Sequence, residues 1–217
     1  MLHQLPHHDF ILAHAAPQAP PLVPELKLHL AKDARGVFEA ADHYMDGRLG
    51  ARPYWAFAWP GGQALARYIL DSPDIVAGKI VVDIGAGSGL GAIAAASCGA
   101  GSVTAADIDP LAITACRLNA RLNEVNLQTS TNDPLRVLPD CDVVLIGDLA
   151  YDADLQLRVA QILSDLHAAG TRVLFADRTT ARRPGPDLVP MAEFEAPLCP
   201  PLVEDFVERA RVWEFTP

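Results

Sequence analysis

The stretch that most constrains this chain is an apolar run that leads directly into three alternating glycines. Residues 80–84 (IVVDI) are apolar except for Asp83, as in a buried parallel strand with an acid near its carboxyl end. Gly85, Gly87 and Gly89 follow, and the Ala-rich residues 90–98 have helical composition. Glycine tolerates positive φ and lets the backbone approach a ligand, while a helix N-terminus presents unpaired N–H groups. The stretch therefore predicts a strand–loop–helix unit that binds a nucleotide-like ligand.

Two classes of cofactor fit such a loop. A dinucleotide-binding fingerprint needs the spacing G-x-G-x-x-G/A directly after the strand. In the frame that starts at Gly85, Leu90 occupies the third glycine position; the frame that starts at Gly87 fits, but it begins two residues later. The spacing of Asp83, Gly85, Gly87 and Gly89 is instead similar to the first motif of S-adenosylmethionine-dependent methyltransferases. This resemblance implies that the strand acid and the loop backbone hold the amino-acid half of the cofactor.

Polar residues also follow the next two predicted strands. Residues 102–106 end at Asp107, 18 residues after Gly89, where a carboxylate can accept hydrogen bonds from both ribose hydroxyls of either cofactor. A third strand, predicted over 127–131, ends at Asn132 and Asp133. Their polar groups can recognise an adenine amino group, and a cap of the following turn explains them equally well.

Composition limits the class of protein. The 217 residues suit one domain, and with 50% hydrophobic residues the chain is globular, but no apolar run reaches the roughly 18 residues of a membrane span. The formal charge of −10 disfavours a nucleic-acid groove. The four cysteines are scattered without a C-x-x-C pair, which indicates core residues of a reduced cytoplasmic protein and neither a zinc site nor a disulfide framework.

The N-terminal quarter carries few periodic signals. Residues 1–24 contain five prolines and predict an extended or partly disordered arm, whose histidines we interpret as solvated and not as metal ligands. Residues 25–44 repeat apolar side chains at helical spacing, so we expect a helix there, followed by a loop over 45–52.

Four aromatic residues then fall within six positions, 54–59, before a Pro-Gly-Gly turn and a helix that ends near Asp71. A hydrophobic lid over the core explains these aromatics as well as an aromatic wall against a cofactor ring or an alkylammonium substrate.

The remaining pattern alternates strands and helices, as a doubly wound sheet requires. A fourth strand over 142–147 leads to Asp148-Leu149-Ala150-Tyr151, and a helix over 153–167 precedes a fifth strand over 171–176. Residues 189–195 and 211–215 alternate as strands, joined through a short helix over 203–209. A closing antiparallel hairpin would complete a seven-stranded α/β sheet.

Several blocks of the chain together resemble the seven-strand (class I) protein-lysine methyltransferases. They are PYWA at 53–56, WPGGQALARY at 59–68, ADIDP at 106–110, GDLAYD at 147–152 and VWEF at 212–215. The chain is most similar to the lysine methyltransferases of the electron transfer flavoprotein beta subunit and their bacterial relatives, from about Pro21 onward. One block departs: Asp177-Arg178-Thr179-Thr180 stands where the family often has Asp-Pro-Gly-Arg.

The resemblance implies a Rossmann-like fold, S-adenosylmethionine as cofactor, no metal, and roles for particular residues. Trp59 would line the cofactor pocket with Asp83, the three glycines, Asp107 and Asp133. Asp148 would orient the target amine and draw its proton toward solvent, with Tyr151 as channel wall. The Asn/Asp-Pro-Pro-Tyr/Phe motif of enzymes that methylate planar nitrogens is absent, because Leu149 and Ala150 replace both prolines.

The resemblance further implies methyl transfer to lysines of a protein, with the electron transfer flavoprotein beta subunit as expected substrate. Two alternatives remain: a ribosomal-protein or small-molecule N-methyltransferase of the same fold, and a cofactor-binding module or nicotinamide-dependent oxidoreductase. We expect a monomer in the bacterial cytoplasm that binds neither nucleic acid nor membrane. Residues 1–50 would be an arm and helix packed on the core, and residues 51–217 the methyltransferase domain.

Overall fold

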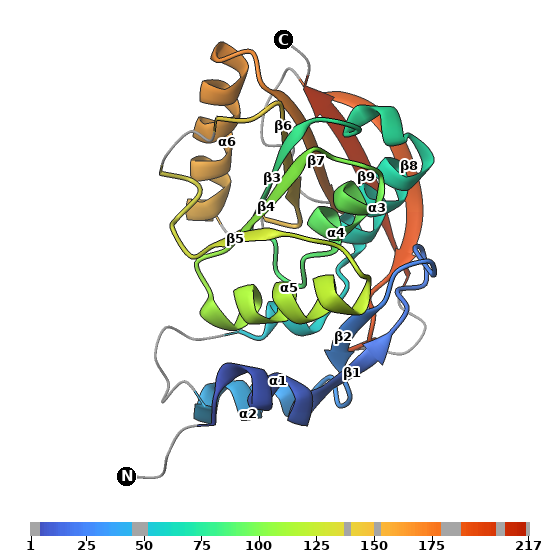
Figure 1. The fold of residues 1–217 in the computed structure, drawn as a ribbon, viewed down its shortest axis with the longest axis vertical. Helices are drawn as coiled ribbons and strands as arrows, with labels where there is room; N and C mark the ends of the chain where they lie inside the picture. The colour runs from blue at the N-terminus through green and yellow to red at the C-terminus, as the bar shows by residue number, and fades with distance from the viewer. Residues whose placement is uncertain are drawn as a thin grey trace.

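A computed structural model describes residues 5–44, 52–136, 140–149, 153–178, 188–202 and 207–215. Its centre is one seven-stranded sheet of order β5-β4-β3-β6-β7-β9-β8 (Figure 1). The strands are β3 (Ile80–Ile84), β4 (Ser102–Ala106), β5 (Gln128–Ser130), β6 (Val143–Gly147), β7 (Arg172–Arg178), β8 (Val189–Pro197) and β9 (Val207–Phe215). The first five are parallel, and β9 runs antiparallel to both β7 and β8. The predicted seven-stranded sheet with a closing hairpin is confirmed.

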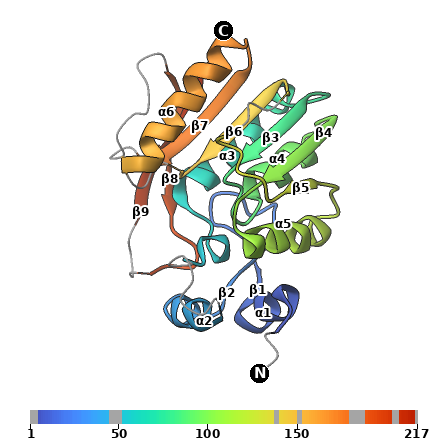
Figure 2. The same cartoon turned by 90° about the vertical axis from the view of Figure 1, so that its left-hand side faces the viewer.

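Helices cover both faces of the sheet, as Figure 2 shows. The helices α3 (Pro60–Asp71) and α4 (Leu90–Ser97) share one buried apolar cluster with the sheet, and α6 (Ala153–Ala168) shares another with the opposite face. The helix α5 (Pro110–Leu122) follows β4, and single-turn 3₁₀ helices occur at η2 (Tyr54–Ala56) and η3 (Pro73–Ile75). No helix among the described residues is long and apolar enough to cross a bilayer.

The order of the strands determines where a ligand can bind. The chain proceeds outward from β3 through β4 to β5, and then returns to place β6 on the other side of β3. The connections on the two sides of this reversal diverge, which leaves a crevice outside the carboxyl ends of β3 and β6. The glycine loop begins at this point of the sheet.

The N-terminal residues differ from the sequence-based prediction. The arm expected over residues 1–24 is wrong for the described part, which forms α1 (His7–His14) and β1 (Ala15–Gln18). The helix expected over 25–44 is correct only for α2 (Gly36–Tyr44), because β2 (Leu28–Ala31) pairs antiparallel with β1. Non-local burial overrides local composition here: all four β2 residues are buried, as are Phe10 and Ile11.

Helix α5 and its C-cap residue support residues 27–29 through two asparagines one turn apart. Asn123 accepts a hydrogen bond from the Lys27 N–H at 2.9 Å and donates to the Lys27 carbonyl at 2.6 Å. Asn119 accepts from the backbone N–H of His29 at 2.7 Å. These amides satisfy backbone groups of the N-terminal segment in the same way as a neighbouring strand would.

The helices α1 and α2 lie together at one end of the molecule, as both views of the fold show. A third buried cluster joins α1 and α2 to η2 and α5. It contains Phe10 and Ile11 from α1, Trp55 from η2, Phe57 directly after η2, and Leu111 from α5. The expected domain boundary near residue 50 falls within 45–51, outside the described residues. Of the short helix expected over 203–209, residues 203–206 also lie outside the described residues, and residues 207–209 belong to β9.

Replacement of Phe10 tests whether α1 is part of the folded core. The Phe10 ring stacks on Tyr44 with centroids 4.2 Å apart, and only 3% of the residue is exposed. We expect Phe10→Ala to lower the free energy of unfolding by about 3–5 kcal/mol, the usual cost of truncating a buried aromatic residue. Urea denaturation measures this change.

Leu12→Ala provides the matched control, because Leu12 lies in the same helix and is 40% exposed. It should change the free energy of unfolding by less than about 0.5 kcal/mol. Equal, small effects of both substitutions would mean that α1 contributes no more than a solvated arm.

Candidate active site

One cavity of about 730 Å³ lies outside the carboxyl ends of the parallel strands. Its lining includes Gly85 after β3, Asp107 after β4, Asp148 after β6 and Asp177 in β7. The volume falls within the range of small-molecule sites, roughly 300–1,000 Å³. The crevice created by the strand order is therefore a pocket of suitable size for a nucleoside cofactor.

The glycine loop forms one edge of this cavity. Gly85, Gly87 and Gly89 have φ values of 68°, 54° and 83°, which are left-handed conformations that favour glycine. A Cβ atom on Gly85 would lie 2.6 Å from the Leu149 side chain, whereas the nearest atom to a Cβ on Gly87 would be a backbone oxygen at 3.9 Å. Gly87 thus leaves the space beside its Cα open to a ligand, while Gly89, which is not among the lining residues, packs against Cys116.

Asp83 lies behind the loop and holds the start of α4. Its carboxylate accepts a hydrogen bond from the Ala92 N–H at 2.9 Å, and only 4% of the residue is exposed. Burial raises the pKa of Asp83 to about 7, since this single hydrogen bond offsets only part of the lost hydration, and the nearby charge of Asp107 raises it further.

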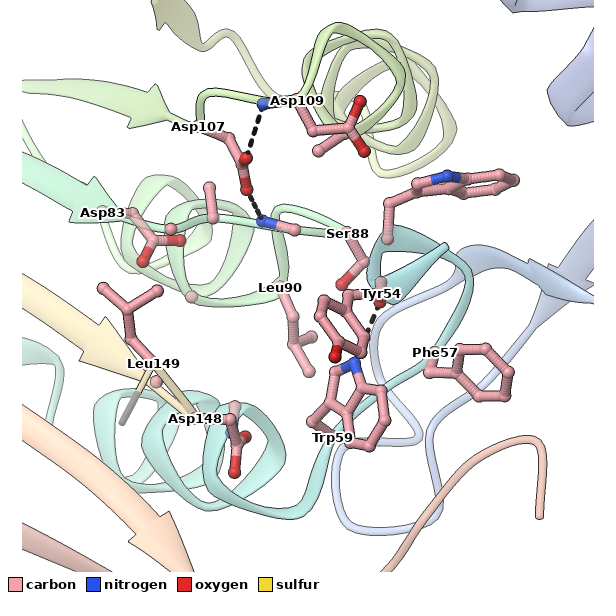
Figure 3. Close-up of a pocket in the computed structure, with 18 of the residues that line it drawn as sticks. Tyr54, Phe57, Trp59, Asp83, Ser88, Leu90, Asp107, Asp109, Asp148 and Leu149 are labelled. Carbon is pink, nitrogen blue, oxygen red and sulfur yellow. Dashed lines mark hydrogen bonds between the residues drawn. The ribbon is translucent and has the colours of Figure 1, made fainter. Parts of the chain in front are cut away.

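Asp107 connects the loop with the first turn of α5. One carboxylate oxygen accepts from the Gly87 N–H and the other from the Asp109 N–H, both at 2.9 Å (Figure 3). Burial raises the pKa of Asp107 despite these two donors. Asp109 lines the same cavity and caps α5 through the Leu111 N–H at 2.8 Å; burial raises its pKa to about 6.

Asp133 lines the cavity at the far side of β4 and is held by two arginines. Its carboxylate accepts from Arg158 of α6 at 2.7 and 2.8 Å and lies 3.2 Å from the Arg136 Nε. Burial favours the neutral form, but the Leu135 N–H and Arg158 outweigh it, so the pKa of Asp133 lies below its ordinary value. Asp133 thus caps the following turn through the Leu135 N–H at 3.1 Å and also lines the cavity.

The aromatic residues at 54–59 form the apolar wall. Trp55 and Phe57 are buried in the cluster with α1, whereas Tyr54 and Trp59 are only partly covered; all four line the cavity. The Trp59 indole donates to the Tyr54 carbonyl at 2.9 Å, which fixes its ring edge-on to Tyr54. Figure 3 shows Tyr54, Phe57 and Trp59 on the side opposite Asp83 and Leu149.

Asp148 lies at the end of β6 with a left-handed φ of 50°. Its carboxylate accepts a hydrogen bond from the Gly62 N–H at 2.6 Å and so caps the first turn of α3. Gly61 permits this contact, because a Cβ there would lie 2.7 Å from the carboxylate. Burial, then the charge of Asp177, raises the pKa of Asp148 to about 7. Tyr151, the other expected catalytic residue, lies outside the described residues.

The cavity is strongly acidic. Its described lining carries seven carboxyl groups and three arginines, and two of those arginines are engaged, Arg158 with Asp133 and Arg178 with Glu208. A cationic ligand would therefore be favoured over an anion such as a dinucleotide pyrophosphate.

The structure thus gathers most of the site residues named from the sequence around one cavity. Trp59, Asp83, Gly85, Gly87, Asp107, Asp133 and Asp148 all line it. Asp109, Asp177 and Arg158 also line the cavity and were not predicted as site residues from the sequence. Asp109 and Asp177 lie just after predicted strands, and this position in the sequence could have identified them. Arg158 lies in a helix and contacts Asp133, which is 25 residues away in the sequence.

Comparison with known proteins places the chain in a family. The family model for ribosomal protein L11 methyltransferase (PrmA) matches residues 64–171. The chain is 38% identical to the electron transfer flavoprotein beta subunit lysine methyltransferase of Rattus norvegicus over 206 residues, 90% of this chain and 78% of that protein. The protein of the same name from Xenopus laevis is 39% identical over 179 residues, 78% of this chain and 69% of the relative.

Solved structures share the fold at low sequence identity. Ribosomal protein L11 methylase from Lactobacillus delbrueckii subsp. bulgaricus has a TM-score of 0.51 at 21% identity, over 72% of this chain and 78% of that chain. Magnesium protoporphyrin IX methyltransferase from Synechocystis PCC 6803, with bound S-adenosylmethionine, has a TM-score of 0.52 at 15% identity, over 71% and 82%. The predicted class I methyltransferase fold is confirmed.

The expectation that this protein is bacterial is wrong. Lysine methyltransferases of this name from rat, Xenopus laevis and mouse each match 78% or more of the chain, which argues against a bacterial origin.

Sequence likeness over nine-tenths of the chain, the shared fold and the cation-favouring cavity agree with one another. The chain is an S-adenosylmethionine-dependent protein-lysine methyltransferase. It belongs to the family of the electron transfer flavoprotein beta subunit lysine methyltransferases.

Proposed function

We propose that the chain methylates lysine side chains of the electron transfer flavoprotein beta subunit, and that cofactor and target lysine meet in the cavity. The observation that carries this proposal is the 38% identity to the rat enzyme of that name across 90% of the chain. In this proposal the enzyme acts as a monomer and binds neither nucleic acid nor membrane. Residues 1–50 form the N-terminal part and residues 51–217 the methyltransferase domain.

The residues present fit S-adenosylmethionine on chemical grounds. The cofactor carries a sulfonium and an ammonium group, which suit an acidic cavity whose buried carboxyl groups have raised pKa values. We assign Asp83, Gly85, Gly87 and Gly89 to its amino-acid half. The open space beside the Gly87 Cα supports this assignment.

We assign Asp107 and Asp133 to the nucleoside of the cofactor and Trp59 to the apolar wall of the cavity. Each oxygen of Asp107 accepts one backbone hydrogen bond, so a second lone pair on each remains for a ribose hydroxyl. Asp133 would recognise the adenine while Arg158 orients its carboxylate. Trp59, fixed by its bond to the Tyr54 carbonyl, would form the apolar wall.

When bound, the cofactor supplies a methyl group on a sulfonium, which passes to nitrogen as the carbon–sulfur bond breaks. The chain must present a neutral amine at this methyl. A lysine ammonium has an ordinary pKa of about 10.4, which desolvation against the aromatic wall would lower. Asp148, half-buried beside that wall, would accept a hydrogen bond from the ammonium and draw its proton toward solvent; most of the acceleration would come from this positioning.

A ribosomal-protein substrate is the second candidate, favoured by the L11 methyltransferase family model over residues 64–171. The L11 methyltransferase of Pelobacter propionicus matches only 51% of this chain at 39% identity. The family-model match over residues 64–171 leaves out the N-terminal segment and the strands β7, β8 and β9, so it supports the shared cofactor domain more than a shared substrate.

The pH dependence of stability tests the burial of Asp83. Its folded-state pKa of about 7 lies above the unfolded value of about 3.9. Below pH 4 both states are protonated; as pH rises to 7 the unfolded state ionises first, so this group's contribution to stability is lost. Relative to the ligand-free wild type, Asp83→Asn should therefore gain roughly 3 kcal/mol in unfolding free energy between pH 4 and 7. Urea titrations across this range give the difference, and parallel curves would exclude a buried acid.

The cofactor assignment predicts that Asp107→Ala weakens S-adenosylmethionine binding by about 1.5–3 kcal/mol, because hydrogen bonds from ribose to a charged group are lost. Calorimetry with S-adenosylmethionine and with NAD measures it. An unchanged affinity in a folded variant would remove Asp107 from the site.

Transfer of a tritiated methyl group to the purified flavoprotein beta subunit, with ribosomal protein L11 in parallel, tests the function. Label should enter lysines of the beta subunit. Asp148→Asn should keep the cofactor affinity nearly intact and lower turnover by a factor on the order of 10²–10⁴. Asp154→Asn, an exposed acid on α6, is the matched control and should remain active.

The outcomes separate the claims. Label in L11 alone would establish the second candidate. An equal loss of cofactor affinity and rate in Asp148→Asn would place Asp148 in the cofactor pocket, and full activity would reduce it to the cap of α3.

A further inference from the structure

We infer that Asn119 is a positioning residue that holds the cofactor loop in its binding conformation and links it to the N-terminal strand β2. The inference rests on the proposed cofactor site at the glycine loop. Asn119 lies on α5, is fully buried, and its amide donates to the Ser88 carbonyl at 2.8 Å. Ser88 lines the cavity between Gly87 and Gly89.

The orientation of this amide follows from its partners. The Asn119 oxygen lies 2.7 Å from the backbone nitrogen of His29 and 2.9 Å from its ring Nδ1. A backbone N–H can only donate, so the oxygen faces His29 and the NH₂ group faces Ser88. The oxygen can only accept, so the ring Nδ1 of His29 carries its hydrogen. One buried side chain thus joins two segments that are 59 residues apart in sequence.

The loop is held on both sides. Cys116, also on α5, contacts the Gly87 carbonyl at 3.4 Å through its thiol, next to the Ser88 carbonyl bound by Asn119. From the other direction, Asp107 accepts from the Gly87 N–H. A loop with three left-handed glycines has many alternative conformations, and these contacts restrict it before a ligand arrives.

The Asn119 amide also links β2 to the cofactor loop. His29 pairs with Pro17 of β1 in the small N-terminal sheet, and it is 9% exposed. The chain of contacts from His29 through Asn119 to Ser88 therefore couples the N-terminal segment to the cofactor loop. The neighbouring Asn123 instead bonds to Lys27, the residue before β2, and to the Asn119 carbonyl of α5.

The test compares Asn119→Asp with wild type in the full chain, using calorimetry with S-adenosylmethionine. Aspartate keeps the oxygen that His29 needs but places an oxygen against the Ser88 carbonyl. We expect the Kd to rise about tenfold, the factor that corresponds to one buried hydrogen bond. The KM for the cofactor should rise similarly with kcat within about twofold at saturation, and amide hydrogen exchange over residues 85–91 should accelerate in the free protein.

Asn123→Ala is the matched control, since it removes the hydrogen bonds to Lys27, outside β2, and leaves the contacts of His29 and Ser88 with Asn119 in place; its Kd should match wild type. Wild-type affinity in a folded Asn119→Asp, or an equal loss in Asn123→Ala, would overturn the inference. If Asn119→Asp does not fold, His29→Ala decides: a Kd raised about threefold supports the link, and an unchanged Kd overturns it. Failure of the wild type to bind S-adenosylmethionine would instead reject the proposed site itself.

Discussion

Burial of carboxyl groups at the ends of parallel strands is the constraint on which the rest of this structure depends. Asp83, Asp107 and Asp148 face one cavity from neighbouring strands, and burial raises the pKa of each. Each is stabilised by a backbone N–H of a loop or of a first helical turn. The starts of α3 and α4 and the path of the glycine loop therefore lie where these carboxylates obtain donors.

The cavity combines two walls of different origin. The sheet supplies the acidic wall. The aromatic wall packs in a cluster with α1 and α2, which precede the seven-stranded sheet in the chain. Charge on one side and flat apolar rings on the other suit a ligand that has a cationic centre and a nucleoside. The N-terminal segment is thus part of the site's architecture, although no described residue of α1 lines the cavity.

What could be predicted from the sequence depends on how local its cause is. The unit β3–loop–α4 is specified by adjacent residues, so both its existence and its glycines were predicted. Residues 7–18 were not, because Phe10 and Ile11 acquire partners only across the chain. Residues 28–31 fit a helical spacing but form a strand, because they pair with β1 and Asn119 of α5 accepts a hydrogen bond from the His29 backbone. Asp133 was placed correctly at the cavity, but its partner Arg158 follows from how α6 packs on the sheet.

The left-handed backbone at Asp148 limits how this position can vary during evolution. Only glycine, asparagine and aspartate adopt φ near 50° at little cost, and other residues are disfavoured by roughly 1–2 kcal/mol. Glutamate would keep the charge and strain the chain; asparagine would fit the chain and lose the charge. A lineage that retains this turn can therefore keep aspartate or abandon the carboxylate, with no gradual route between the two.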